Sequence, residues 1–173
     1  MFALFHLGFE VVKIAALSAV YSSIIYLILH KLKPIQKLTT VRFKTIFLAL
    51  SGLLFIFLFT YYGNHGLGDE ANVPLGHFKT MESGDGYAYF TPGGTASQIN
   101  VDSFLVKKDN LCMATPDGIY VYNLTTNDLE NFPDKLSYEQ HALKAGLPAI
   151  SQFKKFETQY NEYWNRWRFW VLP

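Results

Sequence analysis

Two long apolar runs in the first third of the chain restrict what it can fold into. The first run, residues 2–29, is interrupted only by His6, Glu10, Lys13 and a few small hydroxyl side chains. As a helix, residues 11–29 of this run are long enough to cross about 30 Å of hydrocarbon. Cleaved signal peptides begin with a basic segment, whereas no Lys or Arg precedes Lys13. The first run therefore predicts a retained membrane span.

The second run, residues 46–62, contains no charged residue and ends in Tyr61 and Tyr62. A helix on the surface of a soluble protein needs a polar face, and residues 47–59 offer none. Tyrosine rings favour the headgroup level of a bilayer, which is where this second span would end. We therefore predict a two-helix transmembrane hairpin over residues 1–62 that anchors the chain in a lipid bilayer.

The segment between the two runs indicates the orientation of this hairpin. Residues 31–44 carry five Lys or Arg and no acid, and short basic loops stay on the cytoplasmic side of a membrane. Both termini would then lie on the opposite side. We expect an integral protein of the cytoplasmic (inner) membrane, N-out and C-out, with residues 63–173 forming a domain outside the cytoplasm.

The composition of residues 63–173 excludes two classes of protein. Residues 1–62 have a net charge of +5, whereas residues 63–173 hold nine basic and thirteen acidic residues, a net charge of −4. An acidic domain repels nucleic acid, whose binding depends on neutralising phosphates. Cys112 is the only cysteine, so a scaffold held by intramolecular disulfides is excluded. Cys112 lies in an apolar stretch and is expected to be buried as a small hydrophobic residue.

The residues that follow the anchor predict a small antiparallel β-meander. Residues 63–76 are rich in glycine and are expected to form a linker. Short strands separated by turn residues come next, at 77–82, 87–90, 99–106, 111–115, 119–124 and 129–132. Residues 103–132 resemble one blade of a β-propeller, but a propeller needs at least four blades and no second copy occurs. A single three- or four-stranded sheet is therefore expected, within a membrane α+β fold.

A short helix is predicted over residues 137–144, before the C-terminal segment. Ser137 and Gln140 have the spacing of a capping box at a helix start, and Gly146 followed by Pro148 ends such a helix. The helix would lie between the last strand and the C-terminal segment.

The final segment, residues 150–171, has the pattern of one amphipathic helix that covers the sheet. Its apolar side chains share half of a helical wheel: Phe153, Phe156, Tyr160, Tyr163, Trp164, Trp167, Trp170 and Val171. This aromatic stripe has three interpretations: the core of the domain, docking on the membrane surface, or a subunit interface. The candidate interface residues are Trp164, Trp167, Trp170, Arg166 and Arg168.

No catalytic motif occurs in the sequence, but one weak metal site can be drawn. His65, Asp69 and His77 follow the second run, and two histidines with a carboxylate can hold zinc. Their spacing matches no metal-binding motif, and a Gly-rich loop supports ligands poorly. Solvated linker residues are the favoured interpretation, and no cofactor is expected.

These features favour a non-catalytic, membrane-anchored subunit that serves assembly or partner binding in a membrane complex, or as a homo-oligomer. An immunity or sensory membrane protein belongs to the same interpretation. A second class is a metal-dependent enzyme of the cell envelope, built on the three residues above. A third class is a component of an oligomeric transporter or channel, in which Glu10 and Lys13 would lie on one face of a spanning helix.

Overall fold

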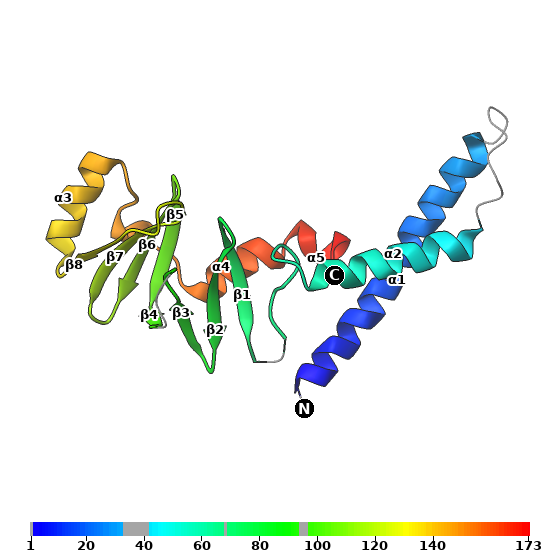
Figure 1. The fold of residues 1–173 in the computed structure, drawn as a ribbon, viewed down its shortest axis with the longest axis horizontal. Coiled ribbons are helices and arrows are strands. Elements are labelled where there is room, and N and C mark those ends of the chain that lie inside the picture. The colour runs from blue at the N-terminus through cyan, green and yellow to red at the C-terminus, as the bar shows by residue number, and fades with distance from the viewer. Residues whose placement is uncertain (1, 33–41, 68, 94–96) are drawn as a thin grey trace. The chain divides into compact units, whose positions relative to one another are not determined.

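The computed structural model of this chain describes residues 2–32, 42–67, 69–93 and 97–173. The chain divides into two compact units (Figure 1). The helical unit consists of Met1–Gly68 and Trp167–Pro173, and the β unit consists of Asp69–Arg166. These boundaries differ from the predicted division at residue 62, because the segment after the second helix and the C-terminal residues belong to the helical unit.

The helical unit contains a long apolar helix, α1 (Phe2–Leu32), and a shorter one, α2 (Phe43–Leu58). Helix α1 is long and apolar enough to cross a membrane. A membrane span and a signal sequence both have this length and composition. Only 17% of the apolar stretch of α1 is buried. Because the core helix of a soluble protein is mostly buried, α1 is unlike such a helix. The predicted second span, 46–62, is helical only as far as Leu58, and turns follow. Most of the basic loop, residues 33–41, lies outside the described residues.

One face of α1 is polar and buried. Glu10, Ser18 and Ser22 are buried at positions that repeat every fourth residue, together with Ile14, and α1 packs along α2. Small hydroxyl side chains allow helix backbones to approach closely. Large apolar side chains on the other faces of α1 and on α2 are exposed, for example Leu27 of α1 at 61% and Leu53 of α2 at 63%.

The β unit contains two four-stranded antiparallel sheets rather than one. The first sheet has the order β1 (Ala71–Gly76), β2 (Lys79–Gly84), β3 (Tyr87–Phe90) and β4 (Ile99–Val101). The second has the order β5 (Ser103–Lys107), β6 (Asn110–Thr115), β7 (Gly118–Asn123) and β8 (Leu129–Phe132). The expected linker thus contains β1, and the strand predicted at 99–106 is divided at Asp102 between the two sheets.

Alternation along the central strands builds two cores, one on each face of the second sheet. Leu111 and Met113 of β6 pack with residues of the first sheet, such as Met81 and Phe90. Cys112 points to the opposite face, where it packs against helix α3 (Lys135–Ala145), as a period of two requires. Cys112 is fully buried as predicted, and burial raises the pKa of its thiol.

The predicted short helix is confirmed, but its N-cap is a different residue. The carboxylate of Asp134 accepts a hydrogen bond from the backbone N–H of Ser137 at 2.8 Å, so Asp134 caps α3 and Ser137 lies inside the first turn. Gly146 ends the helix in the left-handed conformation, with φ of 67°, as its position in the sequence indicates.

The prediction of one continuous helix over residues 150–171 is wrong. The segment contains the 3-10 turn η1 (Ile150–Gln152), helix α4 (Phe156–Trp164) and helix α5 (Trp167–Val171). The backbone of Lys154 pairs with Phe104 of β5 in both directions, at 2.9 and 3.0 Å, which holds the chain extended before α4. Helix α4 belongs to the β unit and packs on β1, whereas α5 belongs to the helical unit.

Three hairpins of the β unit turn through two residues with positive φ, the geometry of type I′ turns. The pairs are His77 and Phe78 (50° and 58°), Asp85 and Gly86 (53° and 83°), and Lys108 and Asp109 (50° and 60°). Only the second pair contains the glycine that this turn favours. A residue with a Cβ is strained in this conformation, so the two turns without glycine carry strain at both positions and the turn at Asp85 and Gly86 carries it at one.

Replacing Phe78 by glycine is expected to stabilise the β unit by about 0.5–1 kcal/mol. This gain is the strain energy released in the turn minus the entropic cost of ordering glycine, which is more flexible in the unfolded chain. Little burial is lost, because Phe78 is 82% exposed. Slower hydrogen exchange of the β6 and β7 amides in the detergent-solubilised chain would measure the gain. Phe78→Ala keeps the Cβ and should gain nothing. Destabilisation by Phe78→Gly would show that contacts of the ring outweigh the strain.

Candidate functional site

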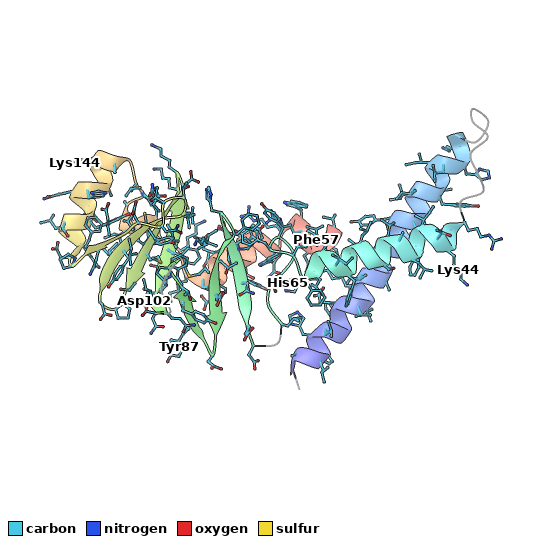
Figure 2. The ribbon with its side chains drawn as sticks, in the orientation of Figure 1. Lys44, Phe57, His65, Tyr87, Asp102 and Lys144 are labelled. Carbon is cyan, nitrogen blue, oxygen red and sulfur yellow. The ribbon has the colours of Figure 1, made fainter. Side chains whose placement is uncertain are left out.

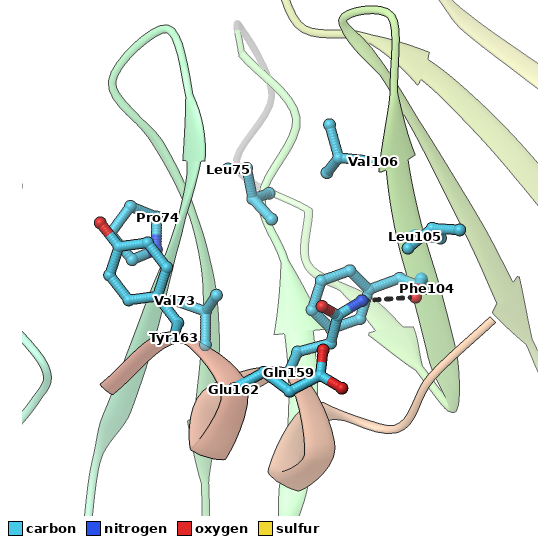
Figure 3. Close-up of a pocket in the computed structure, with 9 residues that line it drawn as sticks. All are labelled: Val73, Pro74, Leu75, Phe104, Leu105, Val106, Gln159, Glu162 and Tyr163. Carbon is cyan, nitrogen blue, oxygen red and sulfur yellow. Dashed lines mark hydrogen bonds between the residues drawn. The ribbon is translucent and has the colours of Figure 1, made fainter. Parts of the chain in front are cut away.

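A groove in the β unit lies between one strand of each sheet (Figure 3). Strands β1 and β5 form its walls, α4 forms its floor, and its volume is about 280 Å³. Most of its lining is apolar: Val73, Pro74, Leu75, Phe104, Leu105, Val106 and Tyr163, with Gln159 and Glu162 as the polar members. Both β1 and β5 are edge strands of their sheets, so the groove runs between two sheet edges.

The polar residues on the floor of the groove are held in place by hydrogen bonds. The Gln159 side-chain amide donates to the Phe104 carbonyl at 2.9 Å (Figure 3). The Lys154 ammonium donates to both carboxylate oxygens of Glu162 at 2.7 Å, and these bonds lower the pKa of Glu162. Glu162 is therefore ionised at neutral pH and forms an ion pair with Lys154 beside the apolar groove.

Each edge strand is partly protected beside the groove. The Trp164 indole N–H donates to the Asn72 carbonyl of β1 at 2.7 Å. Strand β1 also has a bulge between Pro74 and Gly76, and a proline has no N–H to offer an incoming strand. On β5, the pairing of Phe104 with Lys154 occupies one end of the edge. These features are typical of edges that avoid uncontrolled pairing.

A second cluster lies in the helical unit, where three potential metal ligands converge. His6 and Glu10 are one helical turn apart on α1, and His65 lies in the segment after α2 (Figure 2). Glu10 Oε1 is 3.7 Å from His6 Nε2 and 3.6 Å from His65 Nε2. One donor atom from each of the three residues lies within 4.8 Å of the others.

Two of the three residues of this cluster are buried, and a lysine lies at its border. Glu10 is 3% exposed and His65 is 8% exposed, and Lys13 Nζ lies 4.0 Å from Glu10 Oε2. Burial, followed by the positive charges of His6 and Lys13, lowers the pKa of His65 to about 4. His65 is therefore neutral at pH 7, and its contact with Glu10 is not a salt bridge between two full charges.

The structure assigns the predicted metal candidates to different units. His65 joins His6 and Glu10, whereas Asp69 and His77 belong to the β unit. Asp69 lines an acidic pocket with Glu70 and Asp85, and His77 Nε2 lies 3.2 Å from Asp109 Oδ1 at the β1–β2 turn. Sequence reasoning missed His6 and Glu10 as partners of His65. Their four-residue spacing was visible, but the approach of His65 was not.

The predicted interface residues are divided in the same way. Trp164 is 6% exposed in the β unit, whereas Trp167 and Trp170 are 63% and 74% exposed in the helical unit. Arg166 ends the β unit, and the Arg168 guanidinium lies over the Trp167 ring at 5.4 Å. Core and exposed roles thus both occur within the aromatic stripe, at different residues.

Helix α5 contacts α1 through Val171 and Phe169. The Tyr21 hydroxyl donates to the Val171 carbonyl at 2.5 Å, and Lys13 Nζ lies 4.7 Å from the centre of the Phe169 ring.

Comparison of the chain with protein families, with curated proteins and with solved structures found no match.

Proposed function

We propose that this chain is a non-catalytic, membrane-anchored subunit whose β unit binds an extended segment of a partner protein in a membrane complex. The anchor is a two-span hairpin of the cytoplasmic (inner) membrane, with both termini and the β unit outside the cytoplasm. The exposed apolar side chains on α1 and α2 support the anchor, because such side chains suit a lipid environment. The basic residues at 31–44 support the orientation.

The groove between β1 and β5 is the observation that carries this proposal. An extended peptide can bind beside a strand edge, where backbone hydrogen bonds provide affinity and side-chain pockets provide specificity. The apolar walls favour apolar side chains in the bound segment. Glu162 at the floor is already paired with Lys154, but the β unit as a whole is acidic, with thirteen acidic and eight basic residues, which favours a basic segment.

Site-specific photocrosslinking in native membranes tests this function. A photoreactive phenylalanine analogue is placed at Val106, which lines the groove, or at Leu143, which is 87% exposed on α3. We expect a discrete crosslinked protein at Val106 and none at Leu143, because a bound segment contacts only the groove. A product of two copies of this chain would instead indicate a homo-oligomer. Identical products at both positions would refute specific binding in the groove.

A further inference from the structure

The cluster of His6, Glu10 and His65 has the composition of a transition-metal site, and we propose that it binds one divalent zinc ion. The site is built entirely from the helical unit, so it is independent of the groove and of the function proposed for it. Zinc bound there would join the start of α1 to the segment after α2.

The separations between the three donors fit a single ion. Ligands lie 2.0–2.2 Å from zinc, so tetrahedral ligands are about 3.4 Å apart. Glu10 Oε1 is already 3.6–3.7 Å from an imidazole nitrogen of each histidine. The two imidazoles need to move by about 1 Å or less to complete the geometry. The spacing of His6 and Glu10 on one helical face fixes two of the ligands before the third arrives.

The burial of Glu10 is the second, independent observation. Its side chain is 3% exposed, and its Oε2 atom is buried without a hydrogen-bond partner among the described residues. A buried carboxylate is costly unless it is paired or coordinates a metal. Lys13 Nζ lies 4.0 Å from this Oε2 atom, which is beyond hydrogen-bond distance. A metal ion on Oε1, the oxygen that faces both histidines, would neutralise the buried carboxylate at a shorter distance than Lys13 does.

The ligand set favours zinc over other common divalent ions. Two imidazole nitrogens and one carboxylate oxygen suit zinc, whereas calcium and magnesium prefer sites made of oxygen alone. Three protein ligands leave the fourth position of zinc open to water. His6 is the most accessible ligand, with 30% of its side chain exposed, so it marks the side from which an ion can enter.

Lys13 is the group that opposes metal binding. Its ammonium is attracted to Glu10 and repels an incoming cation, but it also lies over the Phe169 ring at 4.7 Å. The ring can retain the ammonium when the carboxylate turns to a metal, because an aromatic face attracts cations. Removal of the lysine charge should therefore strengthen zinc binding.

Zinc titration of the full chain tests the site. Protein purified in detergent and stripped with a chelator is titrated with Zn²⁺ against a chromophoric competitor. We expect about one Zn²⁺ per chain, bound in the four-coordinate geometry that Co²⁺ substitution reports by its visible absorption. His65→Ala and Glu10→Gln should each weaken binding by about 100-fold or more, since even outer-shell partners of ligands contribute about 10- to 100-fold. Lys13→Gln should raise the affinity.

His77→Ala is the matched control, because His77 lies in the β unit beside Asp109 and should leave the affinity unchanged. Zn²⁺ should also raise the melting temperature of the native chain but not that of Glu10→Gln, which retains the shape of the side chain. The site is refuted if the native chain binds no stoichiometric zinc. It is equally refuted if Glu10→Gln, folded by its helical circular dichroism, binds zinc as tightly as the native chain.

Discussion

Replacement of Trp164 by alanine should destabilise the β unit by about 3–5 kcal/mol, as truncation of a buried tryptophan does. Trp164 is 6% exposed, and its indole N–H donates to the Asn72 carbonyl at 2.7 Å. The loss would remove a large part of the 5–15 kcal/mol or so that stabilises a typical domain. Hydrogen exchange of the β6 and β7 amides in the detergent-solubilised chain would measure it, since these core strands exchange by unfolding of the unit.

Trp167→Ala provides the matched control, three residues further along the same stripe. Trp167 is 63% exposed and belongs to the helical unit. The free energy of unfolding of the β unit, measured by the same hydrogen exchange, should therefore change by less than about 0.5 kcal/mol. Trp164→Phe keeps an aromatic ring but loses the hydrogen bond, and should fall between the two. Equal effects of Trp164→Ala and Trp167→Ala would contradict the division of the stripe between the two units.

Gly63→Ala should destabilise the helical unit by about 1–3 kcal/mol or more, the cost of overpacking a tight contact. Gly63 is buried in the turn after α2, and a Cβ there would fall on the carbonyl of Phe57. Backbone cannot yield to a methyl group as a flexible side chain does, so the turn that leads to His65 would shift. A lower melting temperature of the helical circular dichroism signal in detergent is the expected result.

Gly52→Ala is the control for this effect, because no atom lies within 4 Å of a Cβ at Gly52. Alanine favours helix over glycine by about 1 kcal/mol, so Gly52→Ala should be neutral or stabilising. If Gly63→Ala melts at the native temperature, the chain after α2 must be able to relax around the added methyl group. The tight turn would then not determine the position of His65.

The sequence determined the local elements of this protein. Two apolar runs predicted α1 and most of α2, and turn residues predicted most of the strands. Gly146 ends α3 where the sequence placed it. These features depend on side chains close together in the chain, whose conformational preferences act over a few residues.

Tertiary structure decided how the aromatic stripe and the strands are divided. The helical pattern over residues 150–171 continues through α4 and α5, but pairing of Lys154 with Phe104 holds the chain extended before α4. Asp102 likewise separates two strands that one alternating pattern had joined. In both places the local pattern is compatible with a continuous element, and contacts with distant residues select the interrupted one.

The candidate sites also depend on the tertiary structure. The positions of His6 and Glu10 on one helical face follow from their spacing, but His65 reaches them only because the chain turns back after α2. The groove joins β1, β5 and α4, which are distant in the sequence and individually unremarkable. Helical and strand periodicity is a property of neighbouring residues, whereas a binding site requires side chains that only long-range packing brings together.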